Sequence, residues 1–159
     1  MVVVSDTTTI TNLLKIDLLH LVQKLYREII IPQAVYDELA KIPIQKKLLR
    51  ETSWIKVKPI KDRTRVDKLH DRLDLGESEA IILAIELKAD ILVMDERKGR
   101  KIAEEYGLTI IGLFGILIGA KRRGYIKSVK DQMDILINDH SFRVGKAVYN
   151  QVLRLAKES

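Results

Sequence analysis

Short apolar runs rich in β-branched residues alternate along the chain with longer stretches in which apolar residues recur every three to four positions. The short runs predict strands, and the longer stretches predict amphipathic helices. Strands are expected at residues 2–5, 28–31, 54–57, 90–94 and 108–111. Helices are expected at residues 8–24, 33–41, 62–73, 77–88, 96–106, 113–123, 127–138 and 145–157. This alternation predicts an α/β fold of three layers (α/β/α), with a central, mainly parallel sheet of about five strands.

The positions of proline and glycine and the composition limit the possible domain organisation and the possible types of site. Pro32 stands where a helix is expected to begin, and Gly107 and Gly124 stand where helices are expected to end. No linker or repeat interrupts the pattern, so residues 1–159 are expected to form a single domain. The absence of cysteine excludes disulfides and thiolate metal sites. No apolar stretch is long enough for a membrane helix and no signal peptide is evident, so we expect a cytoplasmic protein without membrane contact.

The charge balance favours a polyanionic partner. Lys and Arg number 28 against 22 Asp and Glu, which gives a net charge of +6. Two basic clusters are candidates for binding an RNA backbone: Arg97, Lys98, Arg100 and Lys101, and then Lys121, Arg122 and Arg123. Both clusters also have a structural explanation. The first can pair with Glu104 and Glu105, and the second complements the dipole at a helix C-terminus. Aromatic residues make up only 5% of the chain, so extensive base stacking is not expected.

Acidic residues follow two of the predicted strands. Asp6 comes directly after the first run, VVVS, and Asp95 directly after ILVM, with Glu96 next to it. Ligands of parallel α/β sheets bind outside the carboxyl ends of the strands, so these acids are candidates for one site. Each aspartate could equally be the N-cap of the next helix, a contribution of about 1 kcal/mol, and the two roles do not exclude each other.

Two further segments supply acids. Glu38 shares the apolar stripe of its predicted helix with Val35 and Leu39, where an unpartnered carboxylate would be costly. Glu77 and Glu79 lie in the first turn of another helix, and their spacing does not separate them. Carboxylates gathered at one sheet edge repel each other unless cations neutralise them, and hard oxygen ligands suit Mg²⁺ or Mn²⁺. Such a site on a basic protein is typical of phosphodiester hydrolysis.

At these residues the sequence resembles the PIN-domain family, the nuclease fold of VapC-type toxins. Asp6 with the hydroxyl of Thr8 matches the first acidic motif of the family, and IIIPQAVYDEL is similar to the second, with Glu38 as the acid. EAIILA resembles the third motif and selects Glu79 over Glu77, although the family more often has aspartate there. DILVMDER resembles the fourth motif, with Asp95 at the strand end. The resemblance extends over the whole chain and is closest to a mostly uncharacterised archaeal and bacterial subgroup.

The resemblance implies a Mg²⁺- or Mn²⁺-dependent endoribonuclease that cuts single-stranded RNA as the toxin of a toxin–antitoxin pair. Asp6, Glu38, Glu79 and Asp95 would hold the metal, with Glu77 and Glu96 as alternates, and Thr8 would support a carboxylate or a metal-bound water. Thr7 and Thr9 are expected to be ordinary first-turn residues. The leucine-rich first helices would bind an antitoxin protein or form a homodimer. The alternative is a catalytically silent PIN-fold module that binds RNA or protein without cutting.

Overall fold

The computed structural model describes residues 1–159 and contains one sheet of five strands, all parallel. The strands are β1 (Val3–Ser5), β2 (Ile29–Pro32), β3 (Ile55–Lys58), β4 (Ile91–Val93) and β5 (Ile110–Ile111). Their order across the sheet is β3-β2-β1-β4-β5, so the first strand lies in the middle. All five predicted strands are confirmed, with ends shifted by one or two residues.

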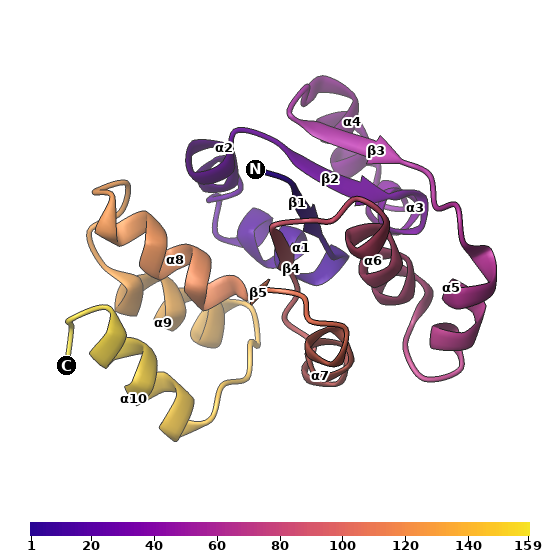
Figure 1. Ribbon diagram of the computed structural model, residues 1–159. Helices are drawn as coiled ribbons and strands as arrows, with labels where there is room; N and C mark the ends of the chain where they lie inside the picture. The colour runs from indigo at the N-terminus through magenta and orange to yellow at the C-terminus, as the bar shows by residue number, and fades with distance from the viewer.

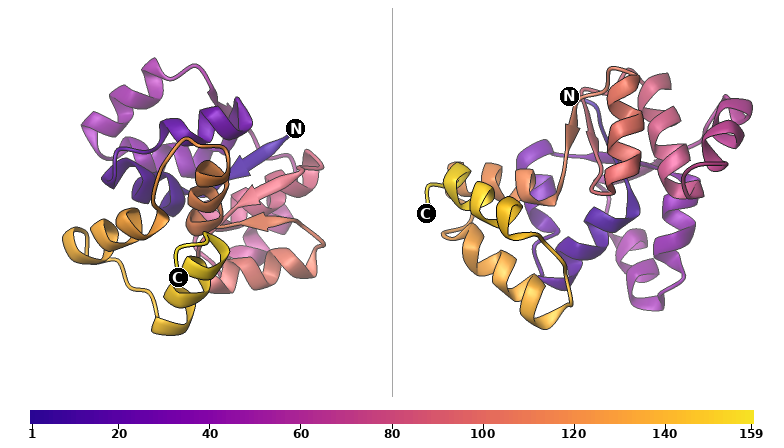
Figure 2. Two further views of the ribbon diagram at one scale, coloured as in Figure 1. Left: turned by 90° about the vertical axis from the view of Figure 1, so that its left-hand side faces the viewer. Right: turned by 90° about the horizontal axis from the view of Figure 1, so that it is seen from below.

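Ten helices connect and cover the strands (Figure 1). They are α1 (Thr7–Lys15), α2 (His20–Tyr26), α3 (Gln33–Ala40), α4 (Pro43–Glu51), α5 (Arg63–His70), α6 (Leu75–Glu86), α7 (Arg97–Glu105), α8 (Leu113–Arg122), α9 (Val129–Asp139) and α10 (Lys146–Leu155). None of them has the length and apolar character that a membrane span requires. Helices α8, α9 and α10, drawn in orange to yellow, stand together beside β5 in all the views (Figures 1 and 2).

Neighbouring residues of β1, β2 and β4 bury their side chains on opposite faces of the sheet. Val3, Ile29 and Val93 belong to a core cluster with α1–α4 and α8–α10. Val4 and Leu92 belong to a second cluster with α5, α6 and α7. The period of two along a strand thus fills two cores, one on each face. The predicted three-layer α/β/α fold is confirmed.

The predicted helix at residues 8–24 is wrong as one element, because the chain turns after Lys15. Asp17 adopts a left-handed conformation (φ 55°), with hydrogen bonds from Asp17 N–H to Leu14 O (3.1 Å) and from Leu18 N–H to Leu13 O (2.8 Å). These two bonds are those of a Schellman C-cap, usually formed around glycine. The leucine pattern continues through this turn, so periodicity alone did not reveal the end of α1. Helix α4 was not predicted, since only Leu49 of its nine residues is buried.

Candidate active site

The carboxyl edge of the sheet brings Asp6 and Asp95 together. β1 and β4 are neighbours, with Ser5 opposite Val93, and each aspartate follows at the end of its strand. The Asp95 N–H donates to Asp6 Oδ2 over 3.2 Å. Asp6 is 2% exposed, which makes it one of the few buried acids of the chain. The strand register alone therefore creates a close pair of carboxylates, as the sequence predicted.

Threonines of the first turn of α1 hold these carboxylates. Asp6 is the N-cap of α1 and accepts from Thr9 N–H (3.1 Å), while the Thr9 hydroxyl donates to Asp95 Oδ2 (2.8 Å). The Thr7 hydroxyl donates to Glu38 Oε2 (3.0 Å). Thr8 is exposed, so the carboxylates are supported by its two neighbours instead. Asp6 thus acts both as a helix cap and as a member of the acid pair, and the expectation that Thr7 and Thr9 are ordinary first-turn residues is wrong.

Burial and mutual repulsion raise the affinity of the pair for protons or cations. Burial, followed by the charge of Asp95, raises the pKa of Asp6 to about 7. Burial also raises the pKa of Asp95, although hydrogen bonds from Leu113 N–H and Thr9 and the charge of Arg100 oppose the shift. Near neutral pH, the pair therefore favours a bound proton or a bound cation over two free negative charges.

Glu38 reaches the same edge from α3, but not as predicted. Val35 and Leu39 are buried, whereas Glu38 is exposed, so its predicted place on the buried stripe is wrong. Its carboxylate accepts from the Thr7 hydroxyl and lies close to the backbone of α6 at Gly76. A Cβ on Gly76 would lie 3.2 Å from Glu38 Oε2 and 3.5 Å from Thr7 Oγ1. Glycine at this position allows α6 to approach the acid closely.

The two glutamates at the start of α6 have different environments. Glu79 is 3% exposed, and both its oxygens have partners: Oε1 accepts from Ala34 N–H (3.1 Å), and Oε2 pairs with Arg63 Nη1 (2.8 Å). Glu79 therefore ties α5 and the start of α3 to α6. Its carboxylate is already fully engaged by protein groups.

Glu77 forms a capping box with Asp74, which leaves its Oε2 buried and without a hydrogen-bond partner. A Cβ on Gly99 would lie 3.2 Å from this oxygen and 3.5 Å from Glu96 Oε2, so the two glutamates face each other across Gly99. Burial, followed by Asp74 and Glu96, raises the pKa of Glu77 to about 8. Glu96 caps α7 through Gly99 N–H (2.6 Å). Of the two candidates, Glu77 is the one with a free acceptor.

The acids occupy adjacent parts of the edge rather than one cluster. Asp6 and Asp95 form a pair, Glu38 lies beside Thr7, and Glu77 lies beside Glu96. No three acidic or histidine side chains come together in a metal-binding arrangement. The glycines that allow close approach were missed, although Gly99 stands in the first turn of a predicted helix and Gly76 directly before another. Glycine costs about 1 kcal/mol inside a helix, so such positions indicate a steric requirement.

The first basic cluster borders the acids, and the second does not. Asp95, Arg97, Arg100, Lys101 and Glu104 line a polar hollow of about 430 Å³. Lys121, in contrast, donates to Ala156 O (2.6 Å) and pairs with Glu158 (3.0 Å). Arg122 and Arg123 are exposed beside it at the end of α8. Of the two basic clusters, only the one on α7 therefore lies next to a candidate acid.

A family model described as a PIN domain matches residues 2–158, nearly the whole chain. The chain belongs to the PIN-domain family. Searches of curated proteins and of solved structures gave no significant match. PIN domains are in general nucleases that use divalent metal ions, and the acids at the sheet edge of this PIN domain occupy the place where α/β proteins bind ligands.

Proposed function

We propose that this PIN domain is a Mg²⁺- or Mn²⁺-dependent endoribonuclease that hydrolyses single-stranded RNA in the cytoplasm, as the toxin of a toxin–antitoxin pair. The observation that carries the proposal is the buried pair of Asp6 and Asp95, with raised pKa values, beside a basic hollow. A buried acid pair is unfavourable for stability, which is typical of a site that binds a cation.

The donor set fits a hard divalent cation. All candidate donors are carboxylate oxygens, and Oε2 of Glu77 is buried, accepts no hydrogen bond and faces the Glu96 carboxylate. We propose that the Asp6 and Asp95 pair holds the ion. Glu38 and Glu77, which lie in adjacent parts of the edge, are further candidate ligands, with Glu96 as an alternate. Glu79, the acid favoured by the family resemblance, is assigned a supporting role because Arg63 and Ala34 already engage both its oxygens. When bound, the ion would activate water and stabilise the leaving oxygen.

The chain's own residues would orient the acids and the substrate. Thr9 fixes the geometry between Asp6 and Asp95, and Thr7 fixes Glu38. Arg97, Arg100 and Lys101 offer positive charge to the phosphodiester backbone next to Asp95. In hydrolysis the oxygen of water bonds to phosphorus, one bridging P–O bond breaks, and the departing oxygen takes up a proton.

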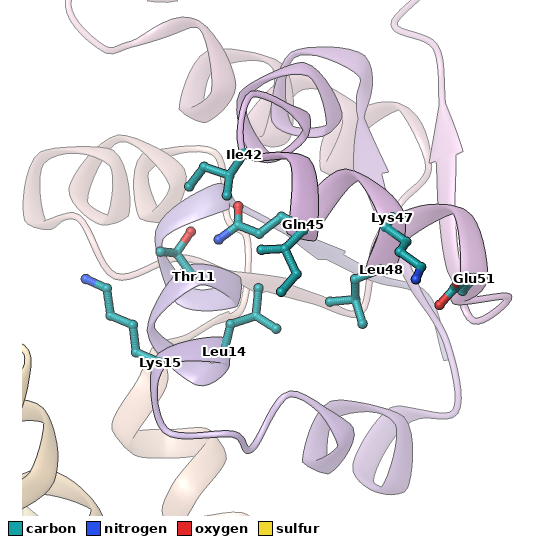
Figure 3. Close-up of a pocket in the computed structure, with 9 residues that line it drawn as sticks. Thr11, Leu14, Lys15, Ile42, Gln45, Lys47, Leu48 and Glu51 are labelled. Carbon is teal, nitrogen blue, oxygen red and sulfur yellow. The ribbon is translucent and has the colours of Figure 1, made fainter.

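A second surface supports the antitoxin part of the proposal. A groove of about 580 Å³ lies between α1 and α4 and includes Leu14, Leu48, Ile42 and Ile44 (Figure 3). Ile44 is 77% exposed and Ile42 is 48% exposed. Lys15 and Lys47 also line the groove. We propose that an amphipathic helix of the antitoxin, apolar on one face and acidic at its flanks, binds here. The homodimer expected from the sequence stays a prediction.

Cleavage of labelled single-stranded RNA with Mn²⁺ or with EDTA tests the enzymatic proposal. We expect cleavage with Mn²⁺ only, and a loss of at least ~100-fold in Asp6→Asn and Asp95→Asn. Asp139→Asn, at the exposed end of α9, is the matched control and should cut normally. RNA binding without any metal-dependent cleavage would instead identify a silent binding module. Cleavage that persists unchanged in both active-site variants would refute the assignment of the acids.

A further inference from the structure

Arg100 has an unusual environment for an arginine so close to an acid. It lies on α7, is half-buried, and lines the same hollow as Asp95. Its charge acts on Asp95, yet the guanidinium forms no ion pair and donates no hydrogen bond to any protein group. Guanidinium has five N–H donors in a planar fork, and protein arginines beside carboxylates commonly form bidentate pairs. The donors of Arg100 are therefore available to a ligand.

Gly112, the N-cap of α8, explains why the two groups approach without pairing. A Cβ on Gly112 would lie 2.6 Å from Asp95 Oδ1 and 2.7 Å from Arg100 Nη1. The carboxylate and the guanidinium thus both contact the backbone at this residue. Asp95 Oδ1 is directed to Leu113 N–H (2.8 Å), which keeps it from turning toward the arginine. The φ of Gly112 is −98°, so glycine is required here for space and not for backbone conformation.

An anion with several oxygens matches this arrangement. Asp95 would hold a cation, and Arg100 presents a fork of donors beside it. A phosphodiester has two non-bridging oxygens, so one can face the cation while the other accepts from guanidinium. We propose that Arg100 contacts the scissile phosphate itself and stabilises the charge that builds up during hydrolysis, whereas Arg97 and Lys101 contact the flanking backbone. This inference rests on the proposed ribonuclease activity and assigns its phosphate-binding residue.

The proposal separates the roles of two arginines of the same helix, so each serves as the control of the other. Loss of a contact to the reacting group lowers the cleavage rate at saturating protein, whereas loss of a contact to flanking phosphates lowers the affinity for RNA. We expect Arg100→Met to slow single-turnover cleavage by about 100-fold or more, with RNA affinity in EDTA reduced by less than about fivefold. Arg97→Met should also reduce the affinity for RNA by less than about fivefold, and it should leave the cleavage rate at saturating protein within about twofold of the wild type. Arg100→Lys should recover only part of the rate, because an ammonium lacks the fork.

A second variant tests the role of the backbone at Gly112. Gly112→Ala should displace the tips of Asp95 and Arg100 and reduce the saturated rate by about tenfold or more, measured at a temperature where thermal unfolding shows the variant to be folded. Gly119→Ala in the same helix is the matched control, because its Cβ would meet only Leu25 at 3.9 Å. It should leave cleavage unchanged.

The outcomes distinguish this inference from the proposed function. If the wild-type protein cuts RNA and Arg100→Met behaves like Arg97→Met, the phosphate role of Arg100 is refuted while the ribonuclease assignment stands. If the wild-type protein does not cut with Mn²⁺, both are refuted. A saturated rate that falls only in Arg100→Met, with both variants equally stable, supports the inference.

Discussion

At the scale of single residues, position in the strand predicted the acid pair, but side-chain partners decided the other roles. Asp6 and Asp95 follow neighbouring parallel strands, so their proximity follows from the sheet. Glu77 and Glu79 both stand in the first turn of one helix, where the dipole favours either acid. Their difference depends on Arg63, Ala34 and Gly99, which come from other elements. No local pattern contains that information.

The contrast between Glu77 and Glu79 gives a direct test. Glu79→Gln should lower the free energy of unfolding by about 1–3 kcal/mol, because it weakens the contacts of a buried carboxylate that joins three helices. Under conditions where Glu79→Gln is folded, its rate of RNA cleavage should lie within several-fold of the wild-type rate. Glu77→Gln should change stability at pH 7 by no more than about 0.5 kcal/mol, because the amide resembles the protonated acid, yet cleavage should fall by ~100-fold.

Urea unfolding and single-turnover cleavage, both at pH 7, measure the two quantities. The opposite pattern, with Glu79→Gln stable and inactive and Glu77→Gln active, would restore Glu79 as the third metal ligand. A variant that loses both stability and activity is compared at a temperature where it is fully folded.

At the scale of elements, helix ends were predicted where glycine marks them. Gly107 and Gly124 both have φ of +77° and end α7 and α8 as expected. The end of α1 was missed because Asp17 takes the position that glycine usually occupies, inside an unbroken leucine pattern. Helix α4 was missed because it is charged and largely exposed. Its apolar side chains face α1, which is distant in the sequence, so the pattern of α4 alone does not reveal the helix.

The end of α1 can be improved by substitution. Asp17→Gly should stabilise the protein by about 0.5–1 kcal/mol, since glycine adopts the left-handed conformation without strain. Gly107→Ala is the converse control. Its Cβ would meet no atom within 4 Å, so its expected loss of about 1 kcal/mol reflects the backbone alone. Urea denaturation of both variants measures the effects, and a loss of stability in Asp17→Gly would contradict the strain argument.

At the scale of the whole molecule, the alternation of strands and helices predicted the layers but not the order of the strands. All five strands are short and apolar, so nothing in the pattern placed β1 in the middle. The packing of α10 on α8 and α9 was equally unpredictable, since it combines apolar contacts of Val152, Leu153 and Ala156 with a charged network near the C-terminus. There Glu158 accepts from Ser128 Oγ, Val129 N–H and Lys130 N–H and pairs with Lys121.

These networks predict a stability maximum at mildly acidic pH in EDTA. Burial opposes ionisation of Glu158, but hydrogen bonds from Val129, Lys121 and Ser128 lower its pKa to about 2. Its contribution is therefore complete above about pH 4.5 and is lost as the pH falls toward 2. The pKa of Asp6 is raised to about 7, so its folded state binds a proton that the unfolded state releases near pH 4. That contribution is lost as the pH rises from about 4 to 7.

Urea midpoints measured from pH 2 to 9 in EDTA test this prediction. Glu158→Gln should flatten the acidic limb. Asp6→Asn should make the limb between pH 4 and 7 shallower, and the rest of that limb should come from Glu77, whose pKa is raised to about 8. The lower limb should be shallow, because a carboxylate near the surface is screened by solvent. A wild-type curve that rises steadily to pH 8 would refute the raised pKa of Asp6.

The hydrogen bond from Leu113 N–H to Asp95 has a consequence beyond the site. It connects the first turn of α8 to Asp95, a carboxylate of the candidate metal site. Through α8 it also connects the C-terminal helices to that site. Thermodynamic linkage between two binding events is reciprocal. A partner that binds α8 to α10 and tilts α8 would change the affinity of the protein for the cation. The cation would change the affinity of the protein for that partner by the same factor. Binding of a partner to the surface of α8 to α10 would thus change the ionisation of the acids.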